Sequence, residues 1–193
     1  MPETRALGLF RWGEALRRER RARRAGRLTI ALAAGAAASA TGLAATLISP
    51  PAPRLVWNAS ASSPVGLYRV TLGVKVQAGD MVIAWPPEPA GELAARRGYL
   101  PATVPLVKRV GAVAGDRVCA AGEALFVNGR LAARRLRTDR IGRPLPWWAG
   151  CADLGPGELL LLAPTRPDSF DGRYFGVTQP PQLIGRAVPL WTR

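Results

Sequence analysis

A short run of hydroxyl side chains near residue 60 is the part of this chain best suited to covalent chemistry. Ser60, Ser62 and Ser63 lie close together, ahead of Pro64 and a strand-like segment that begins at Leu67. A serine hydroxyl is a weak nucleophile at its own pKa and needs a neighbouring base. The chain has no histidine, which excludes the Ser-His-Asp triad, the Cys-His pair and histidine-ligated zinc. We therefore expect no metal and no other cofactor at this site.

The remaining candidate base is a lysine that burial keeps neutral. The chain has two lysines, Lys75 and Lys108, and the second lies in the apolar run 104–110. With the period of a β-strand, Lys108 shares a face with the valines at both ends of this run, while Val107 and Arg109 lie opposite. Lost hydration on such a face lowers a lysine pKa from ~10.4 and prepares the amine to act as a general base. The alternative is an edge-strand lysine whose amine reaches water.

The serine run also has a purely structural interpretation. Clusters of Ser, Asn, Pro and Gly, such as residues 58–68, are typical of turns that lead into a strand. Likewise, the polar segment 168–176 by itself indicates one Asp–Arg pair and no chemistry. The two segments need further support before they indicate an active site.

An uncharged apolar run of 21 residues, 28–48, predicts a membrane-spanning helix. A helix of this length reaches about 30 Å, the thickness of a bilayer core. Pro50 and Pro51 should end the helix, because proline cannot continue one. A cleavable signal peptide is the alternative, but signal cores are shorter than this run. We expect an uncleaved anchor.

Charge indicates how that helix is oriented. The net charge of the chain is +14, and residues 1–27 hold nine arginines against three acidic residues. Positive flanks stay in the cytoplasm. We therefore expect a cytoplasmic arm (1–27), a transmembrane anchor (28–49) and a periplasmic domain (50–193) in a bacterial inner membrane. The densest charge lies beside the apolar run, which favours the phospholipid bilayer over nucleic acid as a partner.

Two cysteines, Cys119 and Cys151, fall on the expected exported side. An oxidising compartment favours a disulfide between them, which would contribute about 3–4 kcal/mol of stability in the chain-entropy model. Two buried free thiols are the alternative.

The exported part has short β-rich runs separated by Gly, Pro and Asp, and it predicts a mainly β fold. Asn128-Gly129 between two apolar runs predicts a hairpin. A proline-bearing insert at 86–100 tolerates a helix, and 134–157 reads as a long irregular loop. The expected strands lie at 67–72, 80–85, 104–113, 117–120, 125–127, 130–132, 158–163 and 183–192.

Three motifs, in this order, resemble the type I signal peptidases, which use a Ser/Lys dyad. They are Ser-x-Pro-x-Gly-Leu-Tyr from Ser62, Lys-Arg-Val from Lys108 with Gly-Asp further on, and Asp-x-Arg-Tyr-Phe-Gly from Asp171. The closer resemblance is to the TraF-type peptidases of conjugation, which mature pilin precursors. Asn-x-Ser-x-Ser-x-Pro-x-Gly-Leu-Tyr at 58–68 and Asp-Arg-Ile-Gly-Arg-Pro-Leu-Pro at 139–146 carry it.

The resemblance covers nearly all of residues 28–193 and implies a signal-peptidase-like β catalytic domain behind one N-terminal transmembrane helix. It implies Ser62 as the nucleophile and Lys108 as the general base. Ser60 would help the Ser62 amide to form the oxyanion hole, while Ser63 should point to the opposite side. Housekeeping members place the nucleophile three residues before the proline, where this chain has Ala61, so the specialised branch fits better.

The third motif supplies the supporting residues that the resemblance implies. Ser169 would orient the lysine amine, and Asp171 and Arg173 would form an ion pair that does no chemistry. Gly172 departs from the pattern, because a serine is common between the Asp and the Arg. Because of this departure, the sequence does not decide how the surrounding residues support the ion pair.

The sequence thus predicts a membrane-anchored serine endopeptidase that processes a membrane-inserted precursor, most simply a conjugative pilin precursor. A housekeeping signal peptidase that cleaves secretory signal peptides is one alternative. A non-catalytic scaffold of a secretion complex is the other. In the TraF branch the acyl-enzyme is released by water or by the substrate's own amine, and the sequence does not decide between these outcomes.

Overall fold

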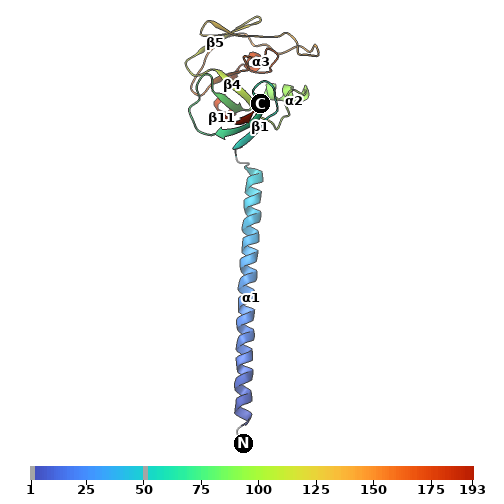
Figure 1. The fold of residues 1–193 in the computed structure, drawn as a ribbon, viewed down its shortest axis with the longest axis vertical. Helices are drawn as coiled ribbons and strands as arrows, with labels where there is room; N and C mark the ends of the chain where they lie inside the picture. The colour runs from blue at the N-terminus through green and yellow to red at the C-terminus, as the bar shows by residue number, and fades with distance from the viewer. Residues whose placement is uncertain (1–2, 50–51) are drawn as a thin grey trace. The chain divides into compact units, whose positions relative to one another are not determined.

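The structure, a computed structural model, describes residues 3–49 and 52–193, and side chains from residue 17 onward within these ranges. The chain divides into two compact units, Met1–Pro51 and Ala52–Arg193. The first unit is one helix, and the second holds both sheets (Figure 1). Pro50 and Pro51, which we expected to end the helix, lie outside the described residues.

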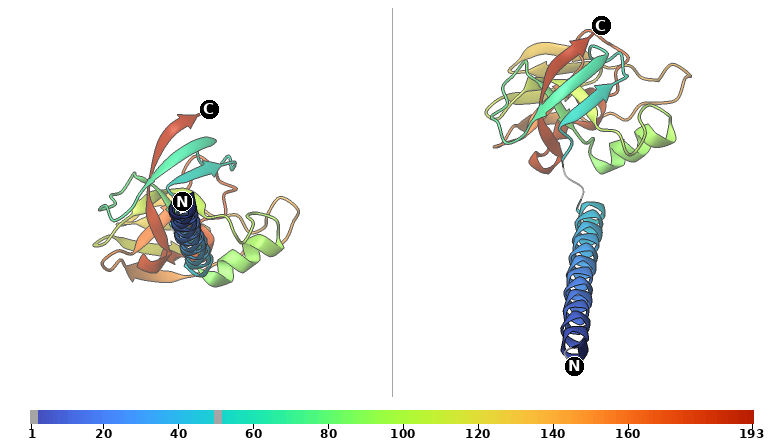
Figure 2. Two further views of the ribbon diagram at one scale, coloured as in Figure 1. Left: turned by 90° about the horizontal axis from the view of Figure 1, so that it is seen from below. Right: turned by 60° about the horizontal axis from the view of Figure 1, so that its bottom comes forward.

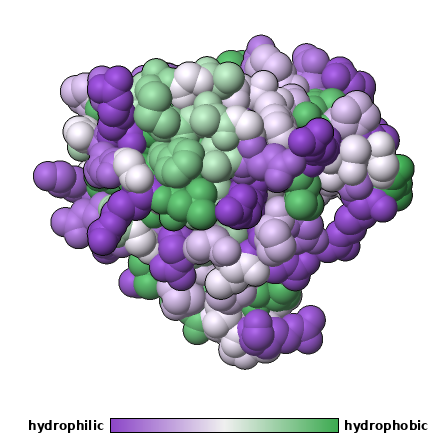
Figure 3. Space-filling view, turned by 90° about the horizontal axis from the view of Figure 1, so that it is seen from above, coloured by the Kyte–Doolittle hydropathy of each residue, from purple (hydrophilic) through white to green (hydrophobic). Residues whose placement is uncertain are grey.

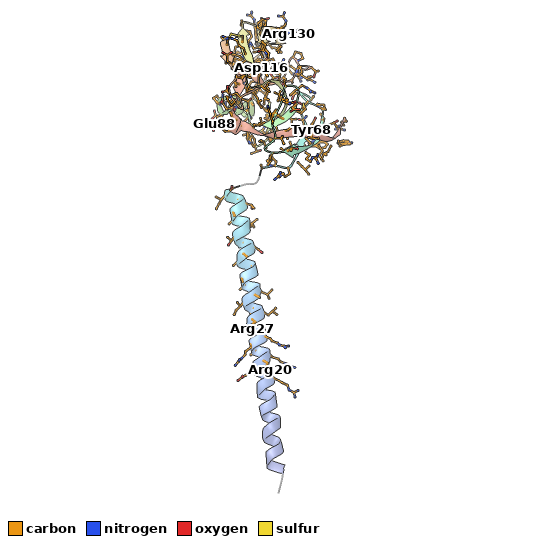
Figure 4. The ribbon with its side chains drawn as sticks, turned by 90° about the vertical axis from the view of Figure 1, so that its left-hand side faces the viewer. Arg20, Arg27, Tyr68, Glu88, Asp116 and Arg130 are labelled. Atoms are coloured by element: carbon orange, nitrogen blue, oxygen red, sulfur yellow. A yellow bond between two sulfur atoms is a disulfide. The ribbon has the colours of Figure 1, made fainter. Side chains whose placement is uncertain are left out.

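The helix α1 (Glu3–Ile48) joins the expected arm and anchor without a break. Arg20 and Arg27 project from it, and the side chains described along it are exposed (Figure 4). The part of α1 whose side chains are described, Arg17–Ile48, is long and apolar enough to cross a membrane. The hydroxyls of Thr29 and Ser39 donate to backbone carbonyls four residues earlier, which satisfies polar groups that hydrocarbon could not.

Within residues 52–193, seven strands form one antiparallel sheet in the order β1-β2-β11-β3-β4-β9-β10. The C-terminal strand lies beside β2, as the red and green strands of Figure 2 show. The strands are β1 (Leu55–Asn58), β2 (Gly66–Thr71), β3 (Met81–Ala84), β4 (Leu106–Ala112), β9 (Leu159–Leu162), β10 (Val177–Thr178) and β11 (Leu183–Thr192).

A second antiparallel sheet of four strands has the order β7-β6-β5-β8. Asn128 and Gly129 turn between β6 and β7 with positive φ, which confirms the predicted hairpin. The disulfide between Cys119 and Cys151 joins β5 to β8. The strands are β5 (Arg117–Ala121), β6 (Ala124–Val127), β7 (Arg130–Arg134) and β8 (Gly150–Asp153).

The apolar run of β9 explains how the two sheets pack. All four of its leucines are buried. Leu160 and Leu162 pack against Val118 and Leu125 of the second sheet, whereas Leu159 and Leu161 pack on the other face of β9. A strand that is buried on both faces loses the alternation of polar and apolar residues.

The remaining elements are short helices: α2 (Glu88–Arg96), α3 (Gly172–Phe175) and the 3₁₀ turn η1 (Pro180–Gln182). The helix α2 lies in the insert where a helix was expected. Strand β8 falls in the expected irregular segment 134–157, where its pairing with β5 outweighs a weak local signal. Some apolar side chains remain on the surface, and Figure 3 shows an area of them on one face. The mainly β fold is confirmed.

Gly66, the glycine of the Gly-Leu-Tyr motif, is the first residue of β2 and pairs with Thr192 near the end of β11. Its φ is 154°, and a Cβ here would lie 2.0 Å from the Trp191 carbonyl oxygen. A residue with a side chain would push β11 away from β2. The motif glycine therefore lets the C-terminal strand approach the strand that follows the serine run.

Candidate active site

The structure brings Ser62, Lys108 and Ser169 together from three separate parts of the chain. Ser62 lies in the loop between β1 and β2, Lys108 near the middle of β4, and Ser169 in the loop before α3. The Lys108 Nζ lies 2.6 Å from Ser62 Oγ and 2.7 Å from Ser169 Oγ. A neutral amine in this position can accept the Ser62 proton while it donates a hydrogen bond to Ser169.

Lys108 is almost completely enclosed, with 3% of its surface exposed. Burial lowers its pKa from the ordinary value to about 8, against the opposing charge of Asp171 and with help from Arg173 and Arg166. A lysine with this pKa is partly neutral near pH 7, so it can act as a base.

The surroundings of Lys108 differ in one respect from the simple alternating strand that we expected. Val107, on the opposite face, is also buried, because both faces of β4 are covered. Val104, expected on the same face as Lys108, precedes β4 and is 36% exposed. Arg109 is exposed, as alternation predicts.

Ser60 and Ser63, in the loop between β1 and β2 that carries Ser62, have different hydrogen-bond partners. The Ser60 Oγ lies 3.0 Å from Ser62 Oγ and accepts a 3.3 Å hydrogen bond from the Ser62 amide. The Ser60 hydroxyl therefore occupies the space in front of that amide, and must turn aside before both groups can donate to a substrate oxygen. Ser63 instead donates to the Val107 carbonyl at 2.8 Å, which places it away from Lys108, as expected.

A buried ion pair supports the loop that carries Ser169. The side chains of Asp171 and Arg173 are 0% and 3% exposed and meet through two hydrogen bonds of 2.8 and 2.7 Å. Burial is the largest influence and opposes the charge on Arg173, but the hydrogen bonds to Asp171 and its negative charge together outweigh it and raise the pKa of the guanidinium. Arg173 also donates to the carbonyls of Arg166 and Pro167, so it holds the segment just before Ser169.

Gly172, the departure from the family pattern, has a structural reason. A Cβ at this position would lie 2.8 Å from both the Leu161 carbonyl oxygen and Leu160 Cδ1. The start of α3 therefore packs directly on the backbone of β9. A serine here would displace α3, so the glycine fits this site and does not weaken the ion pair.

A groove of about 790 Å³ is lined by Ser62 and Lys108 and by a set of residues that the sequence did not reveal. Tyr99 lines this groove, and its hydroxyl donates to Asp139 Oδ2 at 2.5 Å. Arg143 donates to the same carboxylate oxygen at 2.6 Å. Burial works against the Asp139 charge, but these hydrogen bonds, together with those from the backbone amides of Arg143 and Ile141, outweigh it and lower the pKa of the carboxyl. They link Tyr99 to the segment 139–143, and both line the groove.

A second ion cluster connects residues that line the groove with the loop that carries Ser169. Arg166 and Arg140 both donate to the Asp168 carboxylate, which lowers its pKa. Asp168 directly precedes Ser169, so this cluster fixes the loop from the solvent side. A polar Asp-Arg-rich sequence around 139–146 was the only signal for these contacts. In the described residues, no group of His, Cys, Asp or Glu side chains could hold a metal ion.

Comparison with known proteins gives consistent results. Residues 27–191 match the family described as signal peptidase, peptidase S26. A plasmid transfer protein TraF from Escherichia coli is 36% identical over 146 residues, covering 69% of this chain and 82% of that protein. A conjugal transfer protein TraF from Agrobacterium fabrum is 36% identical over 144 residues, covering 70% and 81%. A solved signal peptidase I from Enterococcus faecalis is 19% identical with a TM-score of 0.34, covering 58% of this chain and 97% of that one.

Proposed function

Because this chain belongs to the signal peptidase family S26, we propose that it is a membrane-anchored serine endopeptidase that uses Ser62 and Lys108 as its nucleophile and base. The observation that carries the proposal is the 2.6 Å contact between Lys108 Nζ and Ser62 Oγ. A serine beside a lysine with a lowered pKa meets the two requirements of this chemistry, which are a nucleophile and a neutral base.

The reaction would proceed in two stages. Ser62 Oγ attacks the scissile carbonyl carbon while its proton moves to Lys108 Nζ. The Ser62 amide and the Ser60 hydroxyl donate to the resulting oxyanion. Lys108 then gives the proton to the leaving amine as the C–N bond breaks, which leaves an acyl-enzyme. Water, or an amine of the substrate, attacks that ester, and Lys108 again takes and returns the proton.

The supporting residues act through position and not through chemistry. Ser169 accepts a hydrogen bond from the Lys108 amine, which turns the lone pair toward Ser62. Asp171 and Arg173 fix the loop of Ser169. The disulfide between Cys119 and Cys151 lies in the second sheet and stabilises it.

The proposed location is the bacterial inner membrane, with the helix as a single anchor. Residues 1–27 form the cytoplasmic arm, 28–49 the membrane span and 50–193 the periplasmic peptidase domain. The support is the position of the arginines at one end of the apolar run and the length of the helix. Exposed, stacked Trp57 and Trp191 suit contact with lipid headgroups.

The proposed substrate is a membrane-inserted pilin precursor of a conjugation system. The support is the likeness to proteins named for plasmid and conjugal transfer. We expect the purified full-length chain, in detergent, to cleave the pilin precursor of its own transfer system, and to leave unrelated secretory preproteins uncut. Mass spectrometry of the products is the measurement. Cleavage of many unrelated signal peptides would instead identify a housekeeping peptidase, and no cleavage at all would favour a scaffold.

The cleavage rate should depend on pH through Lys108. The amine must be neutral to take the Ser62 proton, so the rate should rise tenfold per pH unit below about 8 and level off above it. A series of kcat/KM values between pH 6 and pH 10 is the measurement. Lys108→Arg should show no activity at any of these pH values, because a guanidinium stays protonated. A profile that is flat through pH 8 would contradict a lysine base.

A further inference from the structure

We propose that Asn58 is a positioning residue, which holds the backbone on both sides of Ser62 so that the serine hydroxyl meets Lys108. This inference rests on the proposed function, in which Ser62 and Lys108 carry the chemistry. Asn58 ends β1, four residues before the nucleophile. It acts through the backbone of residues 60–64.

The side-chain amide of Asn58 lies inside the nucleophile loop. Its Nδ2 lies 2.9 Å from the carbonyl oxygen of Ser60, 3.1 Å from that of Ser63 and 3.0 Å from that of Pro64, and its two hydrogens are shared among these three acceptors. Its Oδ1 accepts a 3.0 Å hydrogen bond from the Ser60 amide. These partners precede and follow Ser62, so one side chain fixes the loop on both sides of the nucleophile.

The chemistry of the loop requires this kind of side chain. Three carbonyl groups point inward, and buried carbonyls need donors. The loop's own backbone supplies one long contact of 3.5 Å, from the Ser63 amide to the Ser60 carbonyl. An asparagine amide supplies both donors and an acceptor, whereas an aspartate has no donors and a leucine has neither. Asn58 is 5% exposed, so water cannot replace it.

The same loop is tied to the strand that carries the base. Ser63 donates to the carbonyl of Val107, the residue before Lys108, at 2.8 Å. The Tyr68 hydroxyl donates to the Pro64 carbonyl at 2.7 Å. The shape that Asn58 imposes on the loop is therefore fixed relative to β4. Proton transfer across a 2.6 Å contact tolerates little movement, since a misplacement of about 1 Å can cost 10²-fold in rate.

A residue that positions Ser62 differs measurably from one that only stabilises the fold. If the loop relaxes, Ser62 moves away and water reaches the Lys108 amine. Less desolvation then raises the pKa of Lys108 from about 8 toward its ordinary value. The charged groups that also act on Lys108 are unchanged by Asn58→Leu. They are Asp171, Arg173, Arg166 and Asp168.

The test compares Asn58→Leu with Asn128→Leu in the full-length chain. Leucine is close to asparagine in shape, makes no hydrogen bonds and adds no charge. Asn128 serves as the matched control, because its side chain also bonds to backbone and side-chain groups, in the hairpin turn of the second sheet. The readouts are kcat and KM for the precursor, the pH profile of the rate and the folded fraction from thermal unfolding.

For Asn58→Leu we expect kcat to fall about 100-fold with little change in KM, and the midpoint of the pH profile to move above 8. Asn128→Leu should lower the unfolding temperature but leave kcat per folded molecule and the pH midpoint unchanged. If Asn58→Leu loses activity only in proportion to its unfolded fraction, with an unchanged midpoint, the positioning role is wrong.

Two further variants keep the test decisive. Asn58→Asp retains the acceptor for the Ser60 amide and loses the donors, so it covers the case in which Asn58→Leu does not fold. It should also lower kcat with little change in KM, and wild-type kcat in this variant would refute the inference. Ser62→Ala separates this inference from the proposed function. If that variant cleaves as well as the unchanged chain, the proposed function fails, and the role of Asn58 fails with it.

Discussion

Ser62→Ala and Lys108→Ala should each abolish cleavage of the precursor, with a loss of at least ~10⁴-fold in kcat. The first removes the atom that forms the acyl-enzyme, and the second removes the buried amine that takes its proton. The double variant should be no slower than either single one, because a nucleophile and its base act as one unit. Single-turnover cleavage of the precursor, followed by mass, is the measurement.

Two variants in the same chain serve as controls for this loss. Lys75→Ala removes the other lysine, which is exposed, and should leave the rate unchanged. Ser63→Ala removes a neighbouring hydroxyl that helps to tie the loop to β4 but does not contact Lys108 Nζ, so it should lower the rate far less than Ser62→Ala. Ser60→Ala should cost ~10²–10³-fold, the usual effect of one oxyanion donor. If Ser63→Ala were inactive and Ser62→Ala active, the assignment of the nucleophile would be wrong by one residue.

Breaking the buried ion pair should have the largest effect on stability. Asp171→Asn leaves the Arg173 guanidinium buried, with 3% of its side chain exposed, and without a charge partner. Removing one partner of such a pair typically costs 3–5 kcal/mol, or about 4 kcal/mol here. Denaturant unfolding of the full-length chain, read by the tryptophans, is the measurement.

The exposed ion pair between Arg117 and Asp153 is the matched control. Its side chains are 62% and 71% exposed, and water solvates either charge alone. Asp153→Asn should therefore change the unfolding free energy by less than ~1 kcal/mol. Equal losses at Asp171 and Asp153 would show that the burial of the first pair carries no energetic weight.

Local pattern predicted most elements of this fold. The Asn128-Gly129 turn, the strand at 183–192 and the apolar helix each have a strong signal within a few residues. The order of the strands in the sheet has no such signal. Strand β11 pairs with β2 and β3 because of long-range packing, and β8 forms only because β5 lies beside it.

The candidate site likewise combines features that a local pattern predicts with contacts that only the folded structure shows. Alternation in one strand placed Lys108 on an apolar face, and the order of three motifs indicated which serines lie near it. The motif alone did not show that Asn58 fills the nucleophile loop, since that contact depends on how the loop closes. Tyr99 and Asp139 are 40 residues apart in the sequence, and neither has a local pattern that indicates the other.

The place of β11 in the sheet has a consequence for how Ser62 and Lys108 are held together. Ser62 precedes β2 and Lys108 lies in β4, and the sheet connects these strands through β11 and β3. Strand β11 lies between β2 and β3, so removing its pairing would divide the sheet into two parts, with Ser62 beside one part and Lys108 in the other. The geometry of the candidate site therefore depends on a strand that supplies neither Ser62 nor Lys108.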